Sequence, residues 1–183
     1  FSGCTSLNTM PLLPATTLAS ACYKGMFNDC KNLTSVIIPD GVTTIDRDAF
    51  SFCTSLTEVT IPEGVTSIGK SAFYGCSSLQ KITLPFVGNK LDGTSSTHFG
   101  YIFGAGGYEA NDTYVPESLK KVTITEGIST VGYGGFYNIT SLEYISVPHS
   151  VTMIEPYSFG GTTAIYRLTN EILTVSGYDR FGD

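Results

Sequence analysis

Phenylalanine recurs in this chain at a fixed spacing. Phe27, Phe50 and Phe73 are 23 apart, and Phe136 and Phe159 are separated by the same interval. The residues between them repeat as well, in the pattern Phe-x-x-Cys-x-x-Leu-x-x-Val-x-Ile-Pro. A period in the twenties is typical of a solenoid, in which each unit buries its apolar side chains against its neighbours. The sequence therefore predicts a stack of coils with one continuous core.

Each unit contains two extended segments joined by turns. In the most regular unit, Val59 and Ile61 alternate with polar residues, as in a strand with one buried face. Pro62 follows directly and ends the strand, because proline has no N–H to donate to a sheet. Ile68 marks a second extended segment after the turn, and we expect residues 71–73 to form a helical or 3-10 corner.

The first unit departs from this pattern. Phe1 and Phe27 differ by 26 in sequence number, so this unit is three residues longer than the others. Leu18, Cys22 and Met26 recur at intervals of four, which predicts a short helix on the back of the solenoid. The chain begins within a repeat rather than with a methionine, and we expect a fragment whose signal peptide or anchor, if any, lies outside it.

The period also breaks in the middle of the chain. Phe73 and Phe136 differ by 63 in sequence number, whereas two units account for 46, which leaves an excess of 17. The extra residues fall in segments 86–97 and 104–118, which are rich in Gly, Ser, Asn and Asp. Between these two stretches, Phe103 is expected to occupy the position of a repeat phenylalanine. Insertions in a repeat array are usually loops on one face, often the binding face, and we predict such loops within residues 86–118.

Composition and charge exclude several classes of function. The chain of 183 residues is 42% hydrophobic and 14% charged, which is typical of a packed protein and sufficient for a single solenoid domain over residues 1–183. Its net charge is −6 and its 10 basic residues form no cluster, which argues against a nucleic-acid partner and against docking on an anionic membrane. No apolar run approaches the roughly 20 residues needed to span a bilayer.

Most of the cysteines share one repeat position, three residues after the phenylalanine. Four of the five occupy it, namely Cys4, Cys30, Cys53 and Cys76. Ile139 occupies it in a later unit, which indicates an apolar slot and a column of small buried thiols. An extracellular disulfide framework is the alternative, because equivalent residues of neighbouring coils lie within bridging distance. We expect no metal site, since there is no Cys-x-x-Cys pair and neither His98 nor His149 has a partner at ligand spacing.

The sequence contains no familiar catalytic motif. There is no Gly-x-Ser-x-Gly, His-Glu-x-x-His or P-loop pattern, and the two histidines lie in different units. A carboxylate pair such as Glu109 and Asp112, on a glycine-rich segment, is more often solvated than catalytic. We therefore predict that the chain is not an enzyme and uses no cofactor.

The repeated unit Ala-Phe-x-x-Cys-x-Ser-Leu-x-x-Ile-x-Ile-Pro-x-x-Val-x-x-Ile resembles the BspA-type leucine-rich repeats of bacterial surface proteins. The resemblance covers roughly Phe1 to Phe159 and is strongest between Cys30 and Cys76. It implies an α/β repeat, a right-handed leucine-rich-repeat solenoid with a parallel sheet on its concave face and short helical or 3-10 segments on its back. It also implies a secreted or surface-displayed bacterial protein that adheres to host matrix or to other cells. The interruption at residues 86–118 and the longer first unit depart from the family's pattern.

Side chains that face away from the core on the predicted sheet are the first candidates for a binding site. Successive residues of a strand point to opposite faces, so if Val59 and Ile61 face inward, Glu58 and Thr60 face outward. Carried through the units, this register places one outward column at Ser35, Glu58, Lys81, Lys121, Tyr144 and Arg167. It places a second outward column at Ile37, Thr60, Thr83, Thr123, Ser146 and Thr169.

Two interpretations of these columns remain open. Tyrosine and arginine dominate the binding energy of protein interfaces, so Tyr144, Arg167 and the lysines are candidate anchors for a protein partner. Alternatively, threonine and serine occupy exposed strand positions through their β-propensity, and Glu58 with Lys81 is an ordinary cross-strand pair.

Aromatic residues in the interruption form a second set of candidates, at Tyr101, Phe103, Tyr108 and Tyr114. On loops, such rings stack on sugars or reach into a partner; alternatively, they cover the core where the repeat is interrupted. Three Asn-x-Ser/Thr matches carry little weight because the motif is so short; they begin at Asn32, Asn111 and Asn138.

We therefore predict a non-enzymatic protein-binding or adhesion module of a bacterial cell-surface or secreted protein, which contacts its partner through the sheet and the interrupting loops. The expected partner is a host matrix protein or another surface protein, and neither a nucleic acid nor insertion into a membrane is expected. One alternative is a structural spacer or assembly unit of a surface or fibre protein. Another is glycan binding by the aromatic residues.

Overall fold

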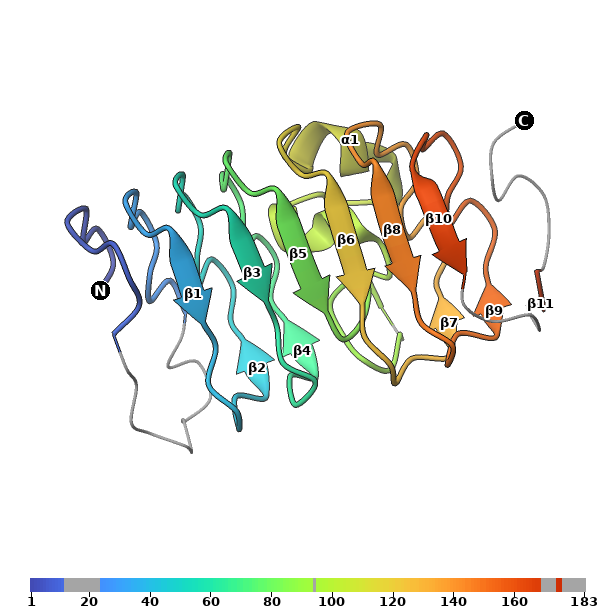
Figure 1. Cartoon of the computed structure of the whole chain (residues 1–183), viewed down its shortest axis with the longest axis horizontal. Coiled ribbons are helices and arrows are strands. Elements are labelled where there is room, and N and C mark those ends of the chain that lie inside the picture. The colour runs from blue at the N-terminus through green and yellow to red at the C-terminus, as the bar shows by residue number, and fades with distance from the viewer. Residues whose placement is uncertain (12–23, 94, 169–173, 176–183) are drawn as a thin grey trace.

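A six-stranded parallel sheet, with one strand from each of six successive coils, extends along the chain in the order β1-β3-β5-β6-β8-β10 (Figure 1). The computed structural model describes residues 1–11, 24–93, 95–168 and 174–175, and side chains of this part up to residue 164. Shorter strands form two further sheets, β2-β4 and β11-β9-β7. The strands are β1 (Ser35–Ile37), β2 (Thr44–Ile45), β3 (Glu58–Thr60), β4 (Ser67–Ile68), β5 (Lys81–Leu84), β6 (Lys121–Ile124), β7 (Thr130–Val131), β8 (Tyr144–Val147), β9 (Met153–Ile154), β10 (Ile165–Leu168) and β11 (Thr174–Val175).

Residues that are one repeat apart in the sequence pair with each other in this sheet. Ser35 of β1 pairs with Glu58 of β3, and Glu58 pairs with Lys81 of β5, each one full repeat further along the chain. The first coil joins the same sheet through a single parallel bridge between Thr9 and Ser35. The predicted parallel-sheet solenoid is therefore confirmed, because only a stack of superimposed coils brings residues one period apart into register.

Each regular coil returns through a second short strand and a turn. Ile45 and Ile68, predicted to be extended, lie in β2 and β4 and pair with each other. The corner at residues 71–73 is a turn rather than the predicted helical or 3-10 segment, since Ser71 has a φ of 62°, which is outside the right-handed helical region. Helical segments in the described residues all lie between β5 and β6: the 3-10 helices η1 (Phe99–Phe103) and η2 (Tyr108–Ala110), and α1 (Asn111–Tyr114).

The repeat phenylalanines form one internal file. The rings of Phe27 and Phe50 are 5.5 Å apart at their centroids, and those of Phe50 and Phe73 are 5.4 Å apart, with nearly parallel planes. Phe136 and Phe159 stack in the same way at 5.6 Å. These side chains are buried, so each ring covers the next one and contributes to a single continuous core.

The cysteines form a second file beside the rings. Cys30, Cys53 and Cys76 are buried, and each thiol donates to the carbonyl of the phenylalanine at the start of the preceding coil, at 3.1 to 3.2 Å. Cys4 is exposed, and the four described cysteines are all free thiols. The column of buried thiols is therefore confirmed at the three internal positions, and the alternative of a disulfide framework is wrong for these residues.

Two phenylalanines share the coil that the interruption occupies. Phe99 and Phe103 are both buried in η1, with ring centroids 5.3 Å apart. Phe103 lies 6.5 Å from Phe73 on one side, and Phe99 lies 5.2 Å from Phe136 on the other. The prediction that Phe103 occupies the repeat position is confirmed. The file of rings is continuous across this coil only because Phe99 lies between Phe103 and Phe136.

The first half of the interruption is divided between the core and the surface. Phe86 and Val87 are buried, and Lys90 makes an antiparallel bridge to Ser67 of β4. The short second sheet ends at β4 and a new one begins at β7, so this coil contributes no described strand between them. Residues 90–93 and 95 are exposed and form no regular strand, so a surface loop is present there, whereas residues 86–88 pack in the core.

In the last coil, the observed register differs from the one predicted for the outward columns. Arg167 of β10 pairs with Ser146 of β8, and Ile165 pairs with Tyr144, so Arg167 belongs to the second row and not to the row of Tyr144. The physical reason is chain length. Tyr144 follows Phe136 by eight residues, whereas Ile165 follows its own repeat phenylalanine by six, and the strand begins two residues earlier.

Two sequence predictions lie outside the described residues. These are the helix expected at Leu18 and Cys22 and the position of Thr169 in the second outward column.

Candidate functional site

The outward side of the six-stranded sheet, which we call the sheet face, displays two rows of aligned side chains. Register places the first row at Ser35, Glu58, Lys81, Lys121 and Tyr144, and the second at Ile37, Thr60, Thr83, Thr123 and Ser146. The residues that alternate with them, such as Val59 and Ile82, are buried. Apart from the shifted last strand, the sequence places every one of these side chains correctly, because the pleat sends alternate residues to opposite faces.

Charged and aromatic groups meet in the middle of the first row. Lys81 Nζ lies 3.7 Å from Glu58 Oε2, and both side chains are more than half exposed. On the next strand, Lys121 Nζ lies 5.3 Å from the centre of the Tyr144 ring, which is within the range of a cation–π contact. Lys81 and Lys121 are themselves direct neighbours in the register. The centre of the sheet face therefore holds two neighbouring lysines, one with its ammonium group near Glu58 and the other with its ammonium group near the Tyr144 ring.

The sheet face is apolar at its N-terminal end. Ile37 is 76% exposed, the largest exposed fraction among the large hydrophobic side chains of the described residues. It borders a shallow groove that Ser35, Glu58 and Thr60 also line. Burying an exposed isoleucine against a partner is favourable by roughly 1.5–3 kcal/mol, so this end offers a contact of a different kind from the lysines.

Four tyrosines gather at one corner of the solenoid. We call Tyr108, Tyr133, Tyr137 and Tyr157 the tyrosine cluster. Ring centroids of Tyr108 lie 5.1 Å from Tyr133 and 5.3 Å from Tyr137, both edge to face, and Tyr133 lies 5.4 Å from Tyr157. A hydrogen bond from the Tyr108 hydroxyl to Tyr133, together with desolvation and the nearby Glu109, raises the pKa of Tyr108. Sequence reasoning selects only Tyr108, because the other three are not part of the interruption.

A buried asparagine fixes the interruption to the coil beside it. The side chain of Asn111 is fully buried: its Oδ1 accepts from Gly100 N–H at 2.9 Å, and its Nδ2 donates to the carbonyls of Gly134 and Tyr137, both at 3.2 Å. Tyr108 packs directly on Gly134, where a Cβ would overlap its ring and φ is +62°. Asn111 begins α1, at the side of the solenoid where β6 and β8 begin (Figure 1). Its glycosylation motif is therefore closed in the folded chain.

The other aromatic candidates divide between core and surface. Phe103 is buried, and Tyr101 packs partly buried against the core with its ring 6.0 Å from His98. Tyr114 is 39% exposed and lies 6.3 Å from Tyr74. The alternative that these rings cover the core is therefore confirmed for Phe103 and Tyr101, whereas Tyr108 and Tyr114 remain accessible.

Two surface aromatics have a strained backbone. The corners at Phe27, Phe50, Phe73, Phe136 and Phe159 each place a residue of positive φ two positions before and two positions after the phenylalanine, and most of these are glycine, aspartate, serine or asparagine. Phe52 and Tyr157 occupy such positions with φ of 60° and 58°. A bulky aromatic there costs on the order of 1 kcal/mol, and strained residues are often found at functional sites. Phe52 packs against the exposed ring of Tyr74, and Tyr157 packs against the exposed ring of Tyr133. The repeat pattern of the sequence does not indicate that the backbone of either residue is strained.

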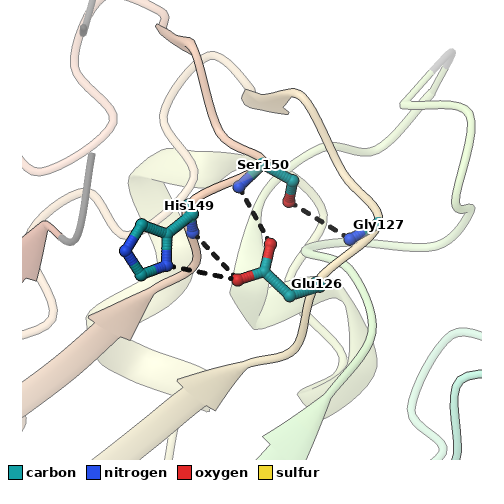
Figure 2. A network of polar contacts seen from close by, with 4 residues as sticks. All are labelled: Glu126, Gly127, His149 and Ser150. Atoms are coloured by element: carbon teal, nitrogen blue, oxygen red, sulfur yellow. Dashed lines mark hydrogen bonds and ion pairs between the residues drawn. The ribbon is translucent and has the colours of Figure 1, made fainter. Parts of the chain in front are cut away.

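Glu126 connects the turns of two neighbouring coils, as Figure 2 shows. Its carboxylate accepts the N–H groups of His149 and Ser150 at 3.1 and 2.9 Å, and Gly127 N–H donates to Ser150 Oγ at 3.1 Å. These hydrogen bonds, that of Ser150 first, lower the pKa of Glu126. The imidazole of His149 contacts the carboxylate from the side away from the Ser150 hydroxyl (Figure 2). A catalytic triad needs the imidazole between the acid and the hydroxyl, so this network is a brace between turns.

The buried titratable groups are held neutral. Burial raises the pKa of the Cys30 thiol, raises that of Cys53 to about 12 and raises that of Cys76 as well. Burial also lowers the pKa of His98, whose ring contacts the Ala105 carbonyl. Within the described residues, no group of three or more His, Cys, Asp or Glu side chains is placed to hold a metal ion, and no helix is long and apolar enough to cross a membrane.

The chain matches a known repeat family over most of its length. The family model described as "BspA type Leucine rich repeat region" matches residues 1–95 and 111–178 in six copies. The unmatched residues 96–110 lie within the interruption. The search against curated proteins found no match.

Solved structures of bacterial leucine-rich-repeat proteins are similar to this chain. A leucine-rich repeat protein from Eubacterium ventriosum is 23% identical with a TM-score of 0.56, and the match covers 87% of this chain and 39% of that one. A leucine rich cell surface protein from Faecalibacterium prausnitzii is 25% identical with a TM-score of 0.45, covering 84% and 48%. A leucine-rich repeat protein from Bacteroides ovatus is 23% identical with a TM-score of 0.48, covering 96% and 46%. This chain therefore spans less than half the length of each of these proteins.

Proposed function

Because this chain belongs to the BspA-type leucine-rich-repeat family, whose repeats typically mediate protein interactions, we propose that it is a protein-binding module that contacts its partner through the sheet face. One observation carries the proposal: five aligned strands present two uninterrupted rows of accessible side chains on a single side. Six parallel strands braced by a continuous core form a rigid platform, so little conformational entropy is lost on binding. The role proposed for the sheet face is recognition of a protein partner, without catalysis.

We further propose that the module acts outside the cell, at a bacterial surface, with a host matrix protein or another surface protein as its partner. The resemblance to BspA-type repeats supports this location. Labelling of intact producing cells with an antibody against the chain tests it. Signal that appears only after permeabilisation would contradict it.

The binding role is tested with a panel of purified host matrix proteins immobilised on a surface. We expect at least one to capture the wild-type chain, and Tyr144→Ala and Lys121→Ala to weaken that capture about three- to tenfold, since hot-spot residues contribute about 1 kcal/mol or more. Tyr114→Ala is the matched control, because Tyr114 is an exposed tyrosine outside the sheet face. Equal capture by all variants would move the site away from the sheet face. No capture at all would favour a structural spacer.

Glycan binding at the tyrosine cluster is a second candidate function, favoured by the strained backbone of Tyr157 and the exposure of Tyr133. Tyrosine rings present an apolar face and a polar hydroxyl, which suits the alternating C–H and O–H surfaces of a sugar. A glycan array probed with wild type and Tyr133→Ala tests this function. Binding that survives loss of the Tyr133 ring, or no binding to any glycan, would reject it.

A further inference from the structure

The distribution of charge in the molecule changes sign on the sheet face. The six strands of the large sheet contain three basic residues, Lys81, Lys121 and Arg167, but a single acidic one, Glu58. Their net charge is therefore +2, and since the whole chain carries −6, all other residues together carry −8. The strands of the candidate binding surface thus oppose the overall charge of the protein.

The position of the two lysines makes this contrast local. Lys81 and Lys121 are direct neighbours on adjacent parallel strands, where like charges destabilise each other. Glu58 balances one of them at 3.7 Å, and Tyr144 contacts the other through its ring, which provides no negative charge. The ammonium group of Lys121 thus faces an aromatic ring rather than a carboxylate. The pair is arranged to accept a further anionic group opposite β5 and β6.

We infer that the partner of the sheet face is a protein segment with adjacent carboxylates, which bind at Lys81 and Lys121. The inference rests on the proposed protein-binding function and adds the chemistry of the partner to it. Carboxylate–ammonium contacts orient the segment across β5 and β6, and the surrounding negative charge of the chain rejects acidic surfaces that approach anywhere else.

The apolar and aromatic side chains on either side of the two lysines favour a protein over a polyanionic sugar as the partner. Ile37, 76% exposed, lies on β1, and Tyr144 lies on β8, four strands away in the sheet order. At about 4.8 Å between strands, this distance is roughly 20 Å, with the lysines between the two ends. A protein surface has apolar side chains that can cover Ile37 and carboxylates that can reach the lysines. A sulfated polysaccharide has the charge but no aliphatic side chain that could bury Ile37.

The direct test uses fluorescently labelled poly-L-glutamate in fluorescence anisotropy with the wild-type chain. The double variant Lys81→Gln with Lys121→Gln is expected to bind about tenfold more weakly, at about two- to fivefold for each exposed charge. Binding by the wild type is expected to weaken as NaCl rises from about 0.05 M to about 0.5 M, because salt screens exposed charges. Both lysines are surface residues, so circular dichroism should show the variant folded.

A matched control separates local from overall charge. Lys24→Gln with Lys90→Gln makes the same change in net charge at two exposed lysines outside the six-stranded sheet. We expect it to retain poly-L-glutamate binding within about twofold of wild type. An equal loss in both double variants would overturn the inference, as would unchanged binding in the Lys81 and Lys121 variant. Heparin is the second probe: lysine-dependent binding of heparin without binding of poly-L-glutamate would assign the site to a sulfated sugar instead.

The matrix-protein panel distinguishes failure of this inference from failure of the proposed function. If Tyr144→Ala abolishes capture of a panel member while the Lys81 and Lys121 variant retains it, the binding function stands and the acidic-partner inference is wrong. If poly-L-glutamate binds through the lysines and no panel member is captured, the site chemistry stands and the proposed matrix partner is wrong.

Discussion

The regular coils, residues 27–84, and the interrupted coil, residues 86–136, fill the same solenoid core in two different ways. In the regular coils one phenylalanine per coil stacks nearly parallel on the next at 5.4 to 5.5 Å, beside a file of thiols. In the interrupted coil, Phe99 and Phe103 are tilted against their neighbours and a buried asparagine replaces part of the backbone pairing. The solenoid thus accommodates inserted residues where their side chains fill the core and their buried polar groups are hydrogen-bonded.

The largest expected effect is loss of one ring from the regular file. Phe50→Ala should lower the free energy of unfolding by about 3–5 kcal/mol, because both neighbouring rings lose a stacked partner and the regular coil has no group to fill the cavity. Phe103→Ala should cost at least about 1 kcal/mol less, since the Phe99 ring lies close enough to relax into the space. Urea denaturation of both variants measures the difference. Equal losses of stability in the two variants would mean that the Phe99 ring does not relax into the space left by Phe103.

The second effect concerns the attachment of the interruption. Asn111→Ala should lower the free energy of unfolding by about 2–3 kcal/mol, because it leaves the Gly100 N–H and the Gly134 and Tyr137 carbonyls buried without this partner. Hydrogen–deuterium exchange should increase in residues 98–118 before it does in the regular coils.

The matched control for this variant is Asn32→Ala. Asn32 is exposed and donates to the Thr5 carbonyl of the preceding coil, so its replacement should cost less than about 0.5 kcal/mol. Similar costs at Asn32 and Asn111 would show that the interruption is held by its apolar contacts alone.

The third effect belongs to the thiol file. Cys53→Ala should lower the free energy of unfolding by about 1–2 kcal/mol at neutral pH, through loss of buried sulfur contacts. The folded-state pKa of Cys53 is about 12 against an ordinary 9.0, so the unfolded chain releases this proton at lower pH than the folded chain. The contribution of the thiol is therefore present below pH 9 and is lost as pH rises toward about 12. Denaturation of wild type and variant across this range should show the two stabilities converging.

Alkylation with iodoacetamide provides the control for burial of the thiols. Peptide mass spectrometry of the native protein should find Cys4 modified and Cys53 protected, because the reagent needs an accessible thiolate. Rapid modification of Cys53 would contradict a closed file.

The smallest effect is expected at the brace between turns. Glu126→Gln should lower Tm by no more than about 2 °C, because the amide oxygen still accepts one N–H. The lowered pKa of Glu126 means that its stabilising contribution is present above the ordinary carboxyl pKa and is lost as pH falls, so the difference between variant and wild type should vanish in acid. Glu63→Gln is the control at the equivalent turn of a regular coil and should leave Tm unchanged. An equal fall in Tm at Glu63 would exclude a role for the network.

Prediction from sequence succeeds where each residue's environment is set by the period. The sheet rows, the ring file and the buried thiols all follow from superimposing residues one period apart, and the alternation along a strand decides which side each residue faces. The predicted register of Arg167 is wrong because two residues are missing before β10, a change in loop length that has no signal in the strand itself.

The tyrosine cluster is not predictable in the same way. Tyr133 and Tyr137 flank Phe136 at one repeat corner and Tyr157 lies at the next, and nothing in their spacing indicates that Tyr108 packs among them. In the sequence, Asn111 stands out only as part of a glycosylation motif, whereas its role depends on three backbone groups supplied by other parts of the chain.

The amino-acid sequence alone therefore established the coil, its period and the side chains that line the sheet face, since a repeat imposes the same local environment on every copy. The course of the interruption, the pairing of Phe99 with Phe103 and the gathering of the tyrosines were set by three-dimensional packing. Residues without a repeat equivalent have no local rule that places them, and they settle where a gap in the core and unbonded backbone groups are available.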